Sequence, residues 1–124
     1  MSSFSKAWAK CMHDNGFPVI DAKTVADALE FVDSIHSAWE KAGGDKKVTI
    51  GALIAAGAFL GIDETALAVL GKAAKIVFIA YLGACISCMG SVAVDDLKRL
   101  FALGKVPKFV VAQLESDGID IAKA

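Results

Sequence analysis

Hydrophobic residues recur at helical spacing in the first third of the chain. The clearest case is an apolar stripe with a period near 3.6 residues, formed by Val25, Leu29, Val32, Ile35 and Trp39. Such a stripe predicts an amphipathic helix. Phe4, Trp8 and Met12 have the same spacing and predict a shorter helix before it. Asn15-Gly16 and Gly43-Gly44 mark the ends of these two helices, because glycine readily adopts the left-handed backbone that closes a helix.

Four further segments complete a helical pattern. Residues 48–62 form one predicted element, 66–94 form one or two helices, and 97–103 and 108–116 form two short ones. No clear period-2 alternation and no repeat of 20–50 residues is evident. The sequence therefore predicts an all-α protein, a compact bundle of about six helices around a central hydrophobic helical hairpin. At 124 residues the chain is long enough for a single domain, 1–124.

Charge divides this domain into three parts. Residues 1–47 and 95–124 are amphipathic and rich in Lys, Asp and Glu, whereas 48–94 carries only Asp63, Glu64, Lys72 and Lys75. As a helix, the uncharged segment 48–62 is about 22 Å long, and the uncharged segment 76–94 is about 28 Å long. The second length is within the range that spans a bilayer. Lys72 and Lys75 precede it, where their ammonium groups can reach lipid headgroups.

Small residues in the apolar segment favour close helix pairing. Gly57 and Gly61 form a GxxxG pattern, and small residues four apart lie on one helix face, which lets a second helix approach closely. A tightly packed soluble bundle uses small residues in the same way. The residues predicted to insert into a membrane or to pair helices are Gly51, Ala55, Gly57, Gly61, Ile76, Phe78, Ala80, Gly83, Ala84 and Val94.

The chain offers little that indicates catalysis. Cys85 and Cys88 form a CxxC pattern, but they lie in an apolar predicted helix without a preceding strand, so we expect inert thiols rather than a redox pair. A zinc site with Cys11 and His13 lacks a second short-spaced ligand pair. We interpret His36 as a core hydrogen-bonding residue, and Asp63 and Glu64 as a helix-capping pair whose charges protonation would remove. No phosphate loop or hydrolase motif is present, so we expect neither an enzyme nor a cofactor.

The overall composition excludes some classes of partner and of protein. The formal net charge is −1, which argues against nucleic acid as a partner. Three cysteines are too few for the disulfide framework of a small secreted miniprotein. No signal peptide is visible at the N-terminus, so we expect a protein that is soluble when made.

The two apolar segments, 48–62 and 76–94, are flanked by amphipathic helices and rich in Gly and Ala. In this arrangement the chain resembles the hydrophobic hairpin of colicin-type pore-forming domains, and it is similar to small pore-forming effectors of bacterial type VI secretion. The resemblance implies an antibacterial, bacteriocin-like toxin that is secreted or delivered to a target cell. There it would depolarise a membrane through residues 48–94. It also implies a lipid bilayer and a cognate immunity protein as partners. The polar residues are too few to line a wide monomeric channel, which indicates self-oligomers or a narrow ion leak.

A second interpretation stays open. A helix that is apolar all round is buried either in lipid or in a protein core. The chain is then a soluble, cytoplasmic all-helical interaction module, such as an immunity or adaptor protein, with the hairpin as its core.

Overall fold

The computed structural model describes residues 2–122, and within this range it contains seven helices and no strand. The prediction of an all-α protein is confirmed. The helices are α1 Ser3–Asp14, α2 Val25–Lys41, α3 Ile50–Ala55, α4 Glu64–Lys72, α5 Phe78–Val92, α6 Val94–Ala102 and α7 Lys108–Ser116.

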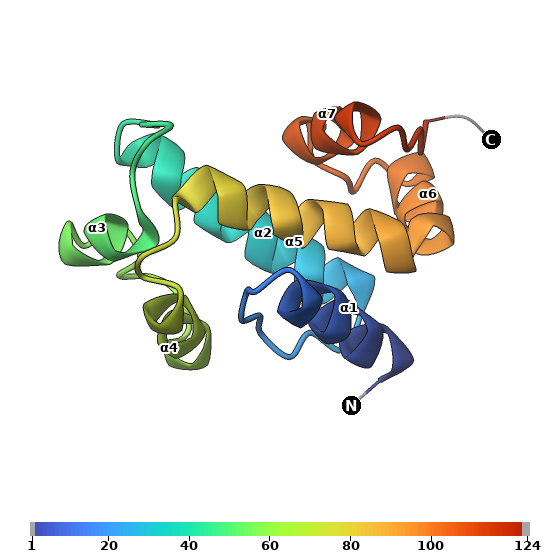
Figure 1. The fold of residues 1–124 in the computed structure, drawn as a ribbon. Helices are drawn as coiled ribbons and strands as arrows, with labels where there is room; N and C mark the ends of the chain where they lie inside the picture. Colours follow the sequence, from blue (N-terminus) through green and yellow to red (C-terminus); the bar gives the residue numbers. More distant parts are fainter. Residues whose placement is uncertain (1, 123–124) are drawn as a thin grey trace.

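Helix α5 is the centre of the molecule. Helices α1, α2, α6 and α7 all pack against it, while α3 and α4 pair with each other at one end, on the left in Figure 1. Eight of the fifteen residues of α5 are buried. One continuous core therefore surrounds this helix, and it includes buried side chains from every other helix.

The two N-terminal helices follow the sequence prediction closely. Ser2 and Thr24 cap α1 and α2, and each side-chain oxygen accepts a hydrogen bond from a backbone N–H in the first turn. Gly16 follows α1 with a φ of 84°, and two glycines with positive φ follow α2. Helix α7 also has the predicted bounds, whereas α6 begins three residues earlier than predicted, with Asp95 and Asp96 in its first turn.

Residues 48–62 do not form one helix. Helix α3 ends at Ala55, and Gly57 has a φ of 75°, a left-handed conformation that ends a helix. Gly57 and Gly61 both lie in the turns that follow. The GxxxG pattern therefore does not lie along a helix face, and the prediction that it does is wrong.

Residues 66–94, predicted to form one or two helices, are divided mainly between α4 and α5. Residues 73–77 leave the helical path because their backbone bonds to the start of α3: Ile50 N donates to Ile76 O and Gly51 N donates to Ala74 O. Thr49 and Val77 form an isolated antiparallel bridge beside these bonds. A β-carbon on Gly51 would lie only 2.9 Å from the Ala74 carbonyl oxygen, so this contact requires glycine. The apolar segment thus contains α3, α4 and α5, and the helices that pair with each other are α3 and α4 rather than the two predicted apolar segments.

Candidate functional site

Helices α1 and α5 are joined by a disulfide and by a side-chain hydrogen bond. The indole Nε1 of Trp8 donates to the Cys85 carbonyl oxygen at 3.0 Å, and the Tyr81 hydroxyl donates to the Pro18 carbonyl oxygen at 2.9 Å. Cys11 and Cys88 form a disulfide. Tyr81, Cys85 and Cys88 occur at helical spacing on one face of α5. Pro18 lies in the loop that follows α1, and we call these contacts of α5 with α1 and that loop the α1–α5 junction.

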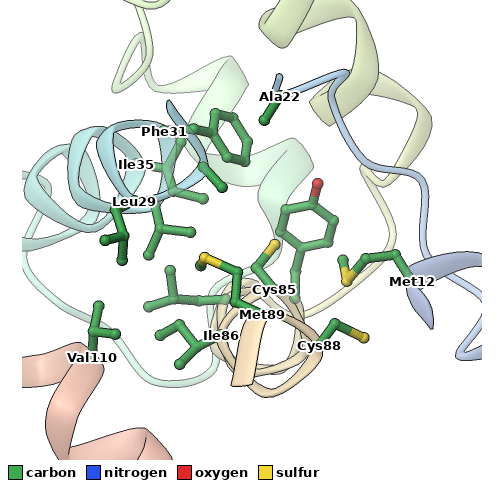
Figure 2. Packing of buried hydrophobic residues seen from close by; sticks show 14 of the residues in the cluster. Met12, Ala22, Leu29, Phe31, Ile35, Cys85, Ile86, Cys88, Met89 and Val110 are labelled. Atoms are coloured by element: carbon green, nitrogen blue, oxygen red, sulfur yellow. The ribbon is translucent and has the colours of Figure 1, made fainter. Parts of the chain in front are cut away.

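The disulfide joins residues 77 positions apart in the sequence. Figure 2 shows Cys88 on the side of α5 that faces Met12 of α1, while Ile86 is on the side of Val110. Cross-linking residues this far apart stabilises the fold by about 4 kcal/mol, because it restricts the unfolded chain. The expectation that Cys88 is an inert free thiol is therefore wrong. Spacing alone could not identify its partner, because Cys11 lies on a different helix.

Cys85 is the remaining cysteine, and it is free and fully buried. Burial raises the pKa of its thiol to about 12, because a thiolate would lose its hydration there. Burial also raises the pKa of the neighbouring Tyr81 hydroxyl, and Cys85 contributes to that shift. The interpretation of Cys85 as an unreactive core residue is consistent with this environment.

The predicted pairing residues of α5 fall on different faces. Phe78 is fully buried and stacks on Trp39 at 5.7 Å between ring centroids, whereas Ala80 is exposed and Ala84 is half-buried. Gly83 lies beside α7, where an added β-carbon would be 3.7 Å from the Gln113 side chain. Two predicted residues flank the helix: Ile76 and Val94 are half-buried against the core.

Gly90 of α5, which the sequence pattern did not single out, lies against side chains of α7 and of the segment after it. A β-carbon on Gly90 would lie 2.5 Å from Leu114 and 2.8 Å from Ile119, both of them side-chain atoms. Helix α7 can therefore approach α5 closely at this point. Small-residue patterns rely on two small residues four positions apart. Gly90 does not form such a pair, because Ile86 and Val94 are large.

Apolar residues of α3 and the following turn are on the surface. Ala52, Ala55 and Ala56 are exposed and share one face by their spacing, and Leu60 is 89% exposed. Of the other predicted pairing residues here, Gly51 contacts residue 74 and Gly61 is exposed. No charged residue lies between 48 and 62. We call Ala52, Ala55, Ala56 and Leu60 the α3 surface.

The four charged residues of the apolar segment are all exposed and border α4. Asp63 occupies the N-cap position without a side-chain capping bond, and Glu64 follows in the first turn. A carboxylate at this end of a helix is favoured by the helix dipole. Lys72 lies in the last turn of α4, and Lys75 lies in the turn before α5.

His36 has a different environment from the predicted one. Its ring stacks on Phe109 of α7 with centroids 3.7 Å apart, and its Nδ1 lies 3.3 Å from a Glu40 carboxylate oxygen. It therefore joins α2 to α7 at the edge of the core. His13 is exposed at the end of α1.

A groove of about 500 Å³ lies between the starts of α1 and α2 and the side of α6. Several polar groups that line it already have partners within the fold. Ser2 donates to the Lys23 carbonyl oxygen, Thr24 caps α2, and Arg99 pairs with Asp96. These groups are used in holding the fold together, and we assign no ligand to the groove.

The side chains and helix lengths were compared with what a metal site and a membrane-spanning helix require. Among residues 2–122, no three His, Cys, Asp or Glu side chains gather closely enough to hold a metal ion. In the same range no single helix is both long and apolar enough to cross a bilayer, although α5 and α6 together meet that criterion as a pair bent by 100°.

Comparisons of the chain with protein-family models, with curated proteins and with solved structures give no match.

Proposed function

We propose that this protein is a membrane-inserting, pore-forming protein of the toxin class, which stores its apolar helix inside a bundle and releases it at a bilayer. The observation that carries the proposal is the position of α5. It has no charged residue from Phe78 to Val92, and it is covered by α1, α2, α6 and α7, which carry charged residues on their exposed faces.

The length of the uncharged segment supports this proposal. Helix α5 alone is about 22 Å long, shorter than the roughly 30 Å apolar core of a bilayer. Residues 76, 77, 93 and 94 are also uncharged. If they become helical, the segment reaches about 28 Å. Insertion therefore requires the bonds between residues 48–51 and 74–78 to break.

The α3 surface supports a first contact with lipid. Leu60 and the three alanines already face solvent, so they can enter the interface without any rearrangement of the core. Burying apolar area in lipid is favourable by about 25 cal/mol per Å². Lys46, Lys47, Lys72 and Lys75 are exposed close to α3 and α4 in the chain and can interact with anionic headgroups.

Few polar side chains are available to line a pore. Ser91 is exposed on α5, and Ser87 donates to the Asp117 carboxylate. A wide channel needs more polar groups than one copy of α5 supplies. The proposal therefore includes either self-association in the membrane or a narrow ion leak. From the resemblance to colicin-type domains it also includes a cognate immunity protein.

Potassium release from vesicles tests this function. Purified protein is added to potassium-loaded phosphatidylglycerol/phosphatidylethanolamine vesicles at neutral and mildly acidic pH, with the disulfide intact and after its reduction. We expect release under at least one of these conditions. Intact vesicles under all of them would contradict the proposal.

Two alanine variants identify the part of the chain responsible. Ala80 on α5 and Ala112 on α7 are both exposed, so an aspartate is tolerated at either position in the folded protein. Ala80→Asp places a charge in the middle of the apolar segment, which is costly in lipid. We expect Ala80→Asp to reduce the rate of release at least about tenfold and Ala112→Asp to leave it unchanged.

A second function is favoured by the α1–α5 junction itself. With the disulfide and two hydrogen bonds in place, α5 serves as an ordinary buried core helix. The α3 surface then suits a protein partner, as in a helical interaction module. A protein that stays monodisperse without detergent and leaves vesicles sealed in every condition supports this alternative.

A further inference from the structure

The contacts that hold α5 in place on the α1 side differ in how they can be released. The two hydrogen bonds of the α1–α5 junction, from Trp8 and Tyr81, exchange with water whenever the interface opens. The Cys11–Cys88 bond is covalent and opens only by reduction. While it is intact, α5 cannot move away from α1 at Cys88, whatever happens to the rest of the core.

We propose that the Cys11–Cys88 disulfide is a redox-controlled latch, which a dithiol reductant opens to release α5 from α1. This inference rests on the proposed function, because it names the event that permits insertion. With the latch closed, the charged helix α1 must accompany α5 into the bilayer. With the latch open, α5 can leave without it.

The geometry indicates which sulfur a reductant attacks. Cys88 is 2% exposed, whereas Cys11 is half-buried near the end of α1. A reductant thiolate therefore reaches Cys11 Sγ first and forms a mixed disulfide there, while the Cys88 sulfur leaves as a thiolate and takes a proton from water. The second thiol of the reductant then displaces Cys11. Two protein thiols and one oxidised reductant disulfide result, so two electrons pass to the protein.

Asn15 is positioned to assist this step. Its side-chain Nδ2 lies 3.9 Å from Cys11 Sγ and 3.7 Å from Cys88 Sγ, and it donates to the Cys11 carbonyl oxygen at 2.8 Å. An amide N–H directed at the leaving sulfur stabilises negative charge on it. Asn15 is exposed, so the disulfide lies behind one polar side chain at the surface rather than deep in the core.

The third cysteine does not interfere with the latch. Cys85 lies one helical turn before Cys88, close enough in sequence for thiol exchange. Its complete burial keeps its thiol protonated, and only a thiolate attacks a disulfide. The disulfide therefore responds to an external reductant and does not rearrange onto Cys85.

The latch is tested by vesicle leakage at controlled redox state. Potassium release is measured with oxidised protein, with protein reduced by dithiothreitol, and with Cys11→Ser, which cannot form the bond. Cys85→Ala is the control, since it keeps the disulfide. We expect the reduced protein and Cys11→Ser to release potassium at least tenfold faster than the oxidised protein. Cys85→Ala should still depend on the reductant, and Cys11→Ser should not.

Hydrogen exchange of the α5 amides in solution gives a second readout. We expect reduction to accelerate exchange in α5 at least tenfold while circular dichroism remains helical. Equal leakage by oxidised and reduced protein would overturn the latch and leave the proposed function standing. Absence of leakage in every sample would overturn the proposed function. In that case unchanged α5 exchange would overturn the latch as well, whereas faster exchange would support it as a conformational device.

Discussion

Helices α3 and α5 come from the same apolar segment but differ in how much of each is buried, two of six residues in α3 and eight of fifteen in α5. Helix α5 directs large side chains, among them Phe78, Tyr81 and Met89, into the core. Helix α3 presents alanines to solvent, and the turn after it presents Leu60. Both are uncharged. The difference shows that absence of charge does not determine burial. Within the two helices the buried side chains are mainly large apolar ones, which gain most from leaving water, whereas Leu60 in the turn is large and still exposed.

The largest expected effect of enclosing α5 is on the reactivity of the Cys85 thiol. Burial raises the pKa of its thiol from 9.0 to about 12, so the thiolate fraction at pH 8 falls about a thousandfold. With the disulfide intact, we expect iodoacetamide to modify Cys85 about a thousandfold more slowly than in urea-unfolded protein. The rate should rise with pH, because the thiolate fraction grows. Rapid modification at pH 8 would show that α5 is not enclosed.

Removal of the Trp8 side chain should give the next largest effect, a loss of stability of the folded protein. Trp8 is fully buried, and its indole donates to the Cys85 carbonyl oxygen. We expect Trp8→Ala to lower the free energy of unfolding by about 3–5 kcal/mol, as measured by urea denaturation with the disulfide intact. A loss below about 1 kcal/mol would contradict the packing of α1 against α5.

Two glycines of α5 should respond with opposite sign. An added methyl group at Gly90 forces the terminal methyl groups of Leu114 and Ile119 to shift within the core, so Gly90→Ala should destabilise the protein by about 1 kcal/mol. At Gly83 the nearest atom is 3.7 Å away, and alanine is the better helix former. Gly83→Ala should therefore stabilise by up to about 1 kcal/mol. Equal changes in the thermal unfolding of Gly90→Ala and Gly83→Ala would show that Gly90 is no more tightly packed than Gly83.

The smallest effect on stability is expected at the α3 surface. Leu60 is 89% exposed, so Leu60→Ser should change the free energy of unfolding by less than about 0.5 kcal/mol. The same change removes the largest apolar side chain of the α3 surface and should weaken vesicle binding in a flotation assay. Unaltered binding would show that this surface is not the first contact with lipid.

The sequence predicts local features of this fold better than its long-range pairings. The bounds of α1, α2 and α7 follow from caps, glycines and a 3.6 period, which are all local signals. The break at residues 73–77 depends on backbone bonds to residues 48–51, and such pairings leave no period in the sequence. The same holds for the candidate site. CxxC spacing drew attention to Cys85 and Cys88, but the bonded partner, Cys11, is on another helix.

The depth of α5 in a bilayer tests the release of this helix most directly. Ile79 is 36% exposed, so Ile79→Trp adds an indole to α5 without filling the core, and Ala112→Trp adds one to exposed α7. Both variants, reduced by dithiothreitol, are mixed with vesicles whose acyl chains carry bromine at mid-chain. We expect strong quenching of the indole added by Ile79→Trp and little quenching of the one added by Ala112→Trp. Equal, weak quenching of both by the lipid, with free access to aqueous iodide, would contradict that release.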